Sequence, residues 1–283
     1  MYWKKIKIKR KNTFLYCWKY SVLKAQNLTG TLPPELVNLP YLEEIELTLN
    51  YLSGTIPQQW GSFTRLLNIS LLGNRLTGSI PIELGNISTL KSLVLEFNML
   101  SGSLPKELGK LINIERLFLT SNNFTGEVPE TFAGLMTMND LRIGDNNFSG
   151  KIPDFIQNWT NLEKLVIQAS GLNGPIPRHI AFLENLSDLR ISDLRGPEAN
   201  FPRLQNMTKM KTLILRSCNI TGQLPEYLWK MNKLTTLDLS FNKLTGEIPS
   251  SYNLLTQVDY MYLTGNLLSG PVPYWMLNRG SSM

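Results

Sequence analysis

Few side chains in this sequence are of the types that perform catalysis, and no group of them is spaced for it. The single histidine, His179, lies in the segment IPRHIAFL, with no cysteine or carboxylate at metal-ligand spacing and no evident acid–base partner. Neither a phosphate-binding GxxxxGKS/T loop nor a kinase DFG or HRD tripeptide occurs. We therefore expect no catalytic residue, no cofactor and no metal site in this chain.

Residue types suited to binding occur instead at one position of a repeating pattern. Apolar side chains alternate there with arginines, and an arginine can hold a peptide or sugar-acid carboxylate with two hydrogen bonds. The alternative is that these are ordinary surface residues without a ligand, because scattered surface apolar groups are common. Both interpretations stay open. The candidate ligand strip consists of Val94, Phe118, Arg142, Val166, Arg190 and Ile214, which share this position, and Arg216, two residues after Ile214.

The spacing of this strip follows from an internal repeat with a period of 24 residues, marked by glycines such as Gly30, Gly54 and Gly78. The same phase carries an apolar LxxLxL triplet, for example Leu42-Ile45-Leu47, whose final alternation predicts a short strand. One coil cannot bury its leucines alone, but stacked coils join their strands into a parallel sheet and their leucines into one core. The period is in the leucine-rich-repeat range.

The predicted fold is thus an α/β-type repeat solenoid of about ten coils over residues 21–278. We expect an arc with the parallel sheet on its concave face and short helical or irregular segments on its convex face. The strip residues alternate with the core leucines and should face the concave side.

A polar residue that must face inward follows each strand. A buried amide is tolerated only when it is hydrogen-bonded, and here it can bridge backbone groups of adjacent coils. Cys218 takes this slot once and is interpreted as a buried structural thiol rather than a nucleophile. The predicted ladder is Asn50, Asn74, Asn98, Asn122, Asn146, Cys218, Asn242 and Asn266.

One coil departs from the pattern. Residues 190–207 keep a strand at Leu189 and Ile191 but replace the LxGxIP element with a stretch containing Pro197 and Pro202. We expect an irregular loop there, which is either a tolerated variation or a docking surface for a neighbouring domain or co-receptor.

The two ends of the chain are expected to lie outside the repeats. Residues 1–20 form a basic irregular head, and the chain after Lys24 carries 20 basic against 22 acidic residues. Because a nucleic-acid footprint lies along a folded face, we expect no nucleic-acid binding.

Residues 279–283 are interpreted as a truncated tail. Neither a clear signal peptide nor a membrane span is recognisable, and the unprotected terminal coils suggest a truncated product.

Sequons of the form N-x-S/T are frequent and are consistent with a glycosylated surface. Asn86, Asn158 and Asn206 share one repeat phase on the convex side and are the preferred glycan sites. Further sequons share a second repeat phase, where an asparagine precedes the consensus Leu-Ser/Thr-Gly of the repeat. These are Asn27, Asn123, Asn147 and Asn219.

Three segments carry a family resemblance: VLKAQNLTGTLPPEL at 22–36, SGKIPDFIQNWTNLEKL at 149–165 and DLRISDLRGPEANFPRL at 188–204. Together with LxGxIP elements such as LTGSIP at 76–81, they resemble the extracellular repeats of plant leucine-rich-repeat receptor-like serine/threonine kinases. The particular subgroup carries a malectin-like domain after its repeats, and the resemblance covers roughly residues 21–278.

The resemblance implies a ligand-binding or co-receptor ectodomain fragment that acts in signal perception on the extracellular side of the plasma membrane. Its partners would be a peptide, glycan or protein ligand and a co-receptor, and any kinase activity would reside in a domain of the parent protein outside this chain. A free-standing secreted inhibitor or decoy, and a non-functional truncated gene product, stay open as alternatives.

Overall fold

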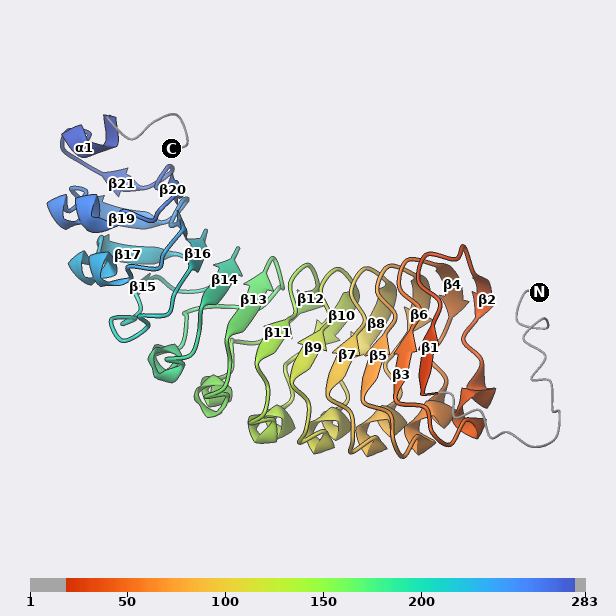
Figure 1. Ribbon diagram of the computed structural model, residues 1–283. Coiled ribbons are helices and arrows are strands. Elements are labelled where there is room, and N and C mark those ends of the chain that lie inside the picture. The colour runs from red at the N-terminus through yellow and green to blue at the C-terminus, as the bar shows by residue number, and fades with distance from the viewer. Residues whose placement is uncertain (1–18, 278–283) are drawn as a thin grey trace. The chain divides into compact units, whose positions relative to one another are not determined.

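The computed structural model describes residues 19–277, and its contacts divide the chain after Met138 into an N-terminal and a C-terminal unit. In each unit the repeats form successive coils, with a main strand on one side and, in most coils, a 3-10 helix on the other (Figure 1). Residues 1–18 of the predicted head, Cys17 among them, and the predicted tail at 279–283 lie outside the described residues.

The predicted LxxLxL strands pair in parallel, each with the strands of the preceding and following coils. Equivalent residues of successive repeats lie opposite each other. Glu44 lies opposite Asn68, and Asn68 lies opposite Ser92. In the N-terminal unit this main sheet contains, in order, β1 (Tyr20–Val22), β3 (Glu44–Glu46), β5 (Asn68–Ser70), β7 (Ser92–Val94) and β9 (Arg116–Phe118). In the C-terminal unit it contains β11 (Asp140–Arg142), β13 (Lys164–Gln168), β14 (Asp188–Ser192), β16 (Thr212–Arg216), β18 (Thr236–Asp238) and β20 (Tyr260–Tyr262).

A second sheet follows the ladder position of each coil, where the LxGxIP element begins. Its glycines adopt positive φ, for example +78° at Gly54 and Gly78, a region that other residues enter only with strain. In the N-terminal unit this sheet contains β2 (Thr29–Thr31), β4 (Tyr51–Gly54), β6 (Arg75–Gly78), β8 (Met99–Ser103) and β10 (Asn123–Gly126). In the C-terminal unit the corresponding strands are β12 (Asn147–Phe148), β15 (Ala199–Asn200), β17 (Ile220–Gln223), β19 (Lys243–Gly246) and β21 (Leu267–Leu268).

The 3-10 helices begin directly after the proline of the LxGxIP element. Proline fixes φ and lacks an N–H group, which suits a residue that precedes a helical turn. Pro81, at φ −63°, accepts from the Leu84 N–H at 3.1 Å and so starts the turn. These helices are η2 (Pro34–Asn38), η3 (Gln58–Ser62), η4 (Ile82–Asn86), η5 (Lys106–Lys110), η6 (Glu130–Gly134), η7 (Asp154–Asn158), η8 (Arg178–Phe182), η9 (Glu226–Lys230) and η10 (Ser250–Leu254). One short α-helix, α1 (Tyr274–Leu277), follows β21.

The core lies between the main strands and the 3-10 helices of each coil. Leu93 and Leu95 of one triplet are fully buried, and so is Trp60, whose indole N–H donates to the Pro33 carbonyl at 3.1 Å. Each buried leucine contributes about 1.5–3 kcal/mol, and most of this burial is against the adjacent coils. The predicted repeat solenoid with a parallel sheet is therefore confirmed.

Hydrogen bonds to the following coil stabilise the coil at 190–207, which breaks the repeat. The predicted strand through Leu189 and Ile191 is β14, and the following segment keeps a short strand, β15, that pairs with β17. The Tyr227 hydroxyl donates to the Pro202 carbonyl at 2.6 Å and accepts from the Leu204 N–H at 3.0 Å. Burial raises the pKa of Tyr227 to about 12, so this hydroxyl stays protonated and keeps its donor role.

Candidate ligand-binding face

The open face of the main sheet consists of the strand side chains that alternate with the buried leucines. In the C-terminal unit the predicted strip residues lie on this face in register: Arg142 is opposite Val166, Val166 opposite Arg190, and Arg190 opposite Ile214. All four are half-buried. Neighbouring strands are about 4.8 Å apart, so these side chains form one continuous column.

Both arginines of this column are already held by carboxylates of their own strands. Arg142 donates two hydrogen bonds to Asp140, at 3.0 and 2.7 Å, and Arg190 donates two to Asp188, at 2.7 and 3.2 Å. Lys164 adds a contact to Asp188 at 2.6 Å. The bidentate geometry that we expected for a ligand carboxylate is thus occupied within the protein.

The environment of Asp188 acts on its pKa in two directions. Burial raises this pKa, but hydrogen bonds and charges from Arg190 and Lys164 outweigh burial and leave the pKa below its usual value. A carboxyl group with a lowered folded-state pKa stabilises the protein above its unfolded-state pKa. That stabilisation is lost as the pH falls through the folded-state pKa.

Replacing Asp188 with asparagine should therefore reduce stability by about 1–2 kcal/mol near neutral pH. The difference from the parent chain should begin to shrink as the pH falls below about 4, and it should shrink further once the pH passes the lowered folded-state pKa of Asp188, because the residue is then protonated in the parent as well. Urea unfolding at several pH values measures both effects. Asp259→Asn, at an exposed residue, is the matched control and should change little; a Asp188→Asn deficit that stays constant down to pH 2 would contradict the interpretation.

The last residue of the predicted strip, Arg216, is exposed and not ion-paired within the described residues. Its guanidinium lies over the Phe241 ring, 4.6 Å from the centroid. Phe241 itself is 50% exposed, and Tyr260 and Tyr262 on β20 are similarly exposed. We call Arg216, Phe241, Tyr260 and Tyr262 the aromatic patch, which has the residue types that dominate binding hot spots.

The N-terminal unit contributes the remaining strip residues. Val94 and Phe118 lie opposite each other on β7 and β9 and are both half-buried rather than fully exposed. More strongly exposed apolar side chains follow the strands: Leu49 is 54% exposed and Phe97 59%. Both have positive φ, 56° and 55°, which is unusual for large side chains.

Phe97, Phe241 and Tyr260 were missed because the sequence prediction followed one column of the repeat. Tyr262 belongs to that column, in register with Asp238 and Ile214, but was not included in the strip. A signal was present: Phe97 and Phe241, like Leu49, immediately precede ladder asparagines, in a slot that in the other coils holds small or polar residues such as Gly73 and Ser121. A large apolar residue in such a slot indicates a surface role rather than core packing.

The polar ladder beneath this face rigidifies each strand. The Asn98 side-chain oxygen accepts from the Leu76 N–H at 3.1 Å, and its amide donates to the Leu71 and Leu95 carbonyls at 3.0 Å each. The same pattern recurs at Asn50, Asn74, Asn122, Asn242 and Asn266. Asn146 donates to the Ile143 and Gly144 carbonyls.

Cys218 occupies the ladder slot as a buried free thiol. Its Sγ lies 3.2 Å from the Arg216 carbonyl and 3.5 Å from the Ile191 carbonyl. Burial raises the pKa of the thiol to about 12, so the reactive thiolate is suppressed at neutral pH.

The asparagines of the predicted glycan sites differ in their exposure and in their hydrogen bonds. Asn86 and Asn206 are exposed, as are Asn27, Asn123 and Asn147. Asn158 is half-buried, and Asn219 donates from its amide to the Leu194 and Gly196 carbonyls at 3.5 and 3.2 Å. His179 lies on η8, where its ring stacks on Phe182.

Comparison with known proteins identifies the repeat. Residues 89–111, 113–135, 209–231 and 233–255 match the Leucine Rich Repeat family. The fold is a leucine-rich-repeat solenoid. Among residues 19–277, no helix combines the length and apolar character that a membrane crossing requires.

Several similar proteins come from Arabidopsis thaliana. A probable leucine-rich repeat receptor-like serine/threonine-protein kinase of Arabidopsis thaliana is 62% identical over 52 residues, which are 18% of this chain and 5% of that protein. The solved Arabidopsis receptor kinase HAESA, in complex with the peptide hormone IDA and the co-receptor SERK1, is 30% identical with a TM-score of 0.83. The match covers 92% of this chain and 47% of that one.

The leucine-rich-repeat ectodomain of the Arabidopsis receptor kinase GASSHO1/SCHENGEN3, solved in complex with CASPARIAN STRIP INTEGRITY FACTOR 2, is 31% identical with a TM-score of 0.78. That match covers 88% of this chain and 33% of that ectodomain chain. The chain thus spans less than half of either solved chain and a small part of the curated kinase.

Proposed function

We propose that this chain is a ligand-binding repeat region of a plant cell-surface receptor-like kinase, and that it binds an extended peptide along the open face of its main sheet. The supporting observation is its likeness, over 92% of its length, to a receptor ectodomain in complex with a peptide hormone and a co-receptor. A co-receptor is the further partner that we propose.

The charges on the face define the ligand chemistry. Because Asp140 and Asp188 neutralise Arg142 and Arg190, the column offers a ligand mainly the apolar surfaces of Val166 and Ile214. Arg216 is the cationic contact, with its hydrogen-bond donors not used by a carboxylate. A peptide with apolar side chains and one acidic group or terminal carboxylate fits this arrangement.

Finer assignments belong to the same proposal. The segment at 188–204 supports the malectin-like-domain-containing subgroup, and the repeats at 21–278 would form the perceiving domain between a basic head and a short tail. The parent protein would lie in the plasma membrane with these repeats outside the cell. Exposed Asn86 and Asn206 are the first candidates for glycans, and Asn158, Asn27, Asn123, Asn147 and Asn219 follow.

A library of random phage-displayed peptides selected on the purified chain tests the proposal. Selected peptides should bind saturably, and Val166→Asp or Ile214→Asp should weaken their binding about tenfold or more, because each replaces an apolar contact surface with a charged, hydrated group. Leu254→Asp, at a 52% exposed apolar residue on η10, is the matched control. The proposal is wrong if Leu254→Asp weakens binding as much as the face variants do.

A further inference from the structure

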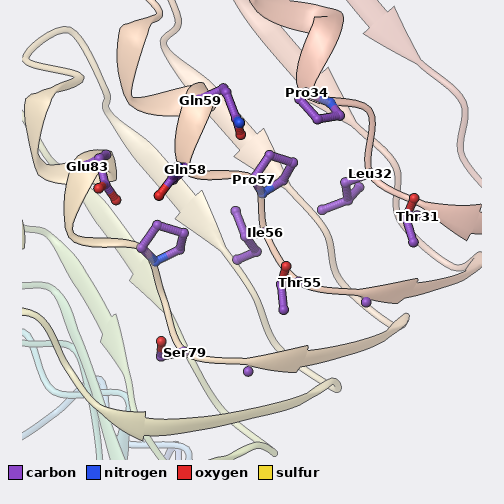
Figure 2. Close-up of a pocket in the computed structure, with 13 residues that line it drawn as sticks. Thr31, Leu32, Pro34, Thr55, Ile56, Pro57, Gln58, Gln59, Ser79 and Glu83 are labelled. Atoms are coloured by element: carbon purple, nitrogen blue, oxygen red, sulfur yellow. The ribbon is translucent and has the colours of Figure 1, made fainter.

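A hollow of about 820 Å³ lies on the side of the N-terminal unit, between the second sheet and the 3-10 helices (Figure 2). The coils that carry β2, β4 and β6 form it. Each of them contributes a hydroxyl side chain at the end of the strand, and these are Thr31, Thr55 and Ser79. The strip on the open face does not include any residue of this hollow.

Two rows of hydroxyl groups run along this sheet, and they differ in their bonding. In the first row Ser53 and Thr77 donate to glycine carbonyls of the preceding coil, at 3.3 and 3.4 Å. In the second row Thr31, Thr55 and Ser79 have no hydrogen-bond partner among residues 19–277. The sheet therefore uses one row for its own cohesion and leaves the other free for a ligand.

The hydroxyls of Thr31 and Thr55 are held in place by the methyl groups on the same side chains. A Cβ atom added at Gly78 would lie 2.9 Å from the Thr55 methyl, and one at Gly54 would lie 3.0 Å from the Thr31 methyl. The methyls thus pack against the neighbouring glycines, and Figure 2 shows the oxygens turned to the side of the prolines. Such preorganisation lowers the entropic cost of binding.

The opposite wall is also polar and nearly uncharged. The side chains of Gln58, Gln59 and Glu83 line it without a hydrogen-bond or ion-pair partner among the described residues. Of residues 19–277, Glu83 is the one ionisable group in the lining, and no cationic side chain is part of it. An anionic ligand would meet repulsion from Glu83 and no compensating charge. Amides and hydroxyls both donate and accept, which suits a neutral, hydroxyl-rich ligand.

Proline rings and a buried isoleucine supply the apolar part of the lining. Pro34 and Pro81 are half-exposed, and Ile56, 2% exposed, lies beneath them. Their C–H surfaces can pack on the C–H faces of a sugar ring. The same set of groups recurs at the strand spacing of about 4.8 Å, so the hollow presents a repeating surface to a repeating polymer.

We propose that this hollow is a binding site for a linear neutral oligosaccharide. An extended peptide fits it less well, because peptide addition needs an unpaired strand edge and pockets for alternate side chains. Within the hollow β2, β4 and β6 already pair with one another, so no strand edge between them is open to a peptide. This site is separate from the proposed peptide face and does not depend on it.

Isothermal titration of the whole chain with cello-oligosaccharides, xylo-oligosaccharides and oligogalacturonides tests the inference. At least one neutral series should bind saturably, and the acidic oligogalacturonides should not. Thr55→Val keeps the methyl packing but removes a hydroxyl, so it should weaken binding about fivefold, as expected for one hydrogen bond. Ser79→Ala should have a similar effect.

Thr77→Val is the matched control, because it makes the same change on the same sheet at a hydroxyl outside the lining. It should leave the affinity unchanged, and melting temperatures of all variants verify their folding. The inference is overturned if no neutral series binds, if oligogalacturonides bind more tightly, or if Thr77→Val weakens binding as much as Thr55→Val and Ser79→Ala.

Discussion

Replacing Asn98 with alanine is expected to lower the free energy of unfolding by about 3 kcal/mol, because one buried N–H group loses its acceptor and two buried carbonyls lose a donor. The Leu76 N–H donates to the Asn98 side-chain oxygen and would be left unsatisfied. The Leu71 and Leu95 carbonyls would each lose one of two asparagine donors and keep the other, from Asn74 and Asn122 respectively. An unsatisfied buried group costs about 1–3 kcal/mol, and each further lost hydrogen bond costs about 0.5–1.5 kcal/mol.

Asn113→Ala is the matched control for this prediction. The Asn113 amide also bridges adjacent coils, through a 2.8 Å hydrogen bond to the Ser88 carbonyl, but it is exposed. Removing the Asn113 amide should lower the free energy of unfolding by less than about 1 kcal/mol, because water can donate to the Ser88 carbonyl in its place. Urea unfolding followed by tryptophan fluorescence measures both variants. Equal losses would mean that burial does not determine the contribution of an asparagine bridge.

The second large effect is expected for Gly85→Ala. A Cβ atom at Gly85 would lie 2.3 Å from the Glu107 carbonyl oxygen and 2.6 Å from its carbon, both in the backbone of the next coil. Backbone cannot rotate away as a side chain can, so the stacking of η4 on η5 must open. Overpacking of this kind costs about 3 kcal/mol.

Gly134→Ala provides the control on a neighbouring 3-10 helix, since a Cβ atom there meets nothing within 4 Å. Its φ is not positive, so alanine should be neutral or stabilise by about 0.5 kcal/mol through the unfolded chain. The melting temperature should therefore fall for Gly85→Ala and stay unchanged or rise slightly for Gly134→Ala. A similar decrease at both positions would show that close approach of the coils is not the cause.

The repeat made the strands, the core and the asparagine ladder accessible from the sequence, because period, residue type and burial all point to the same phase. The leucines at 93 and 95 and the amide at 98 must face inward in any stacked coil. The same reasoning placed Cys218 in the ladder slot, and its burial and raised pKa fit a structural role.

The chemistry of the open face was harder to predict. Asp140 and Arg142, like Asp188 and Arg190, occur two residues apart on a strand and so share a face. That spacing was visible, but whether an arginine turns to its neighbour or to a ligand depends on side-chain conformation. The hollow beside β4 depends on rotamers in the same way. Thr55 and Thr77 are both threonines, but Thr55 lines the hollow whereas Thr77 donates to the Gly54 carbonyl.

The central claim, that a peptide ligand lies along the open face of the main sheet, is tested most directly by photo-cross-linking. A selected peptide carrying a benzophenone group is bound to the chain, irradiated, and its attachment sites are mapped by mass spectrometry. Attachment on β13, β16 or the aromatic patch is the predicted result. Attachment confined to the 3-10 helices, such as η8 or η10, would contradict the claim.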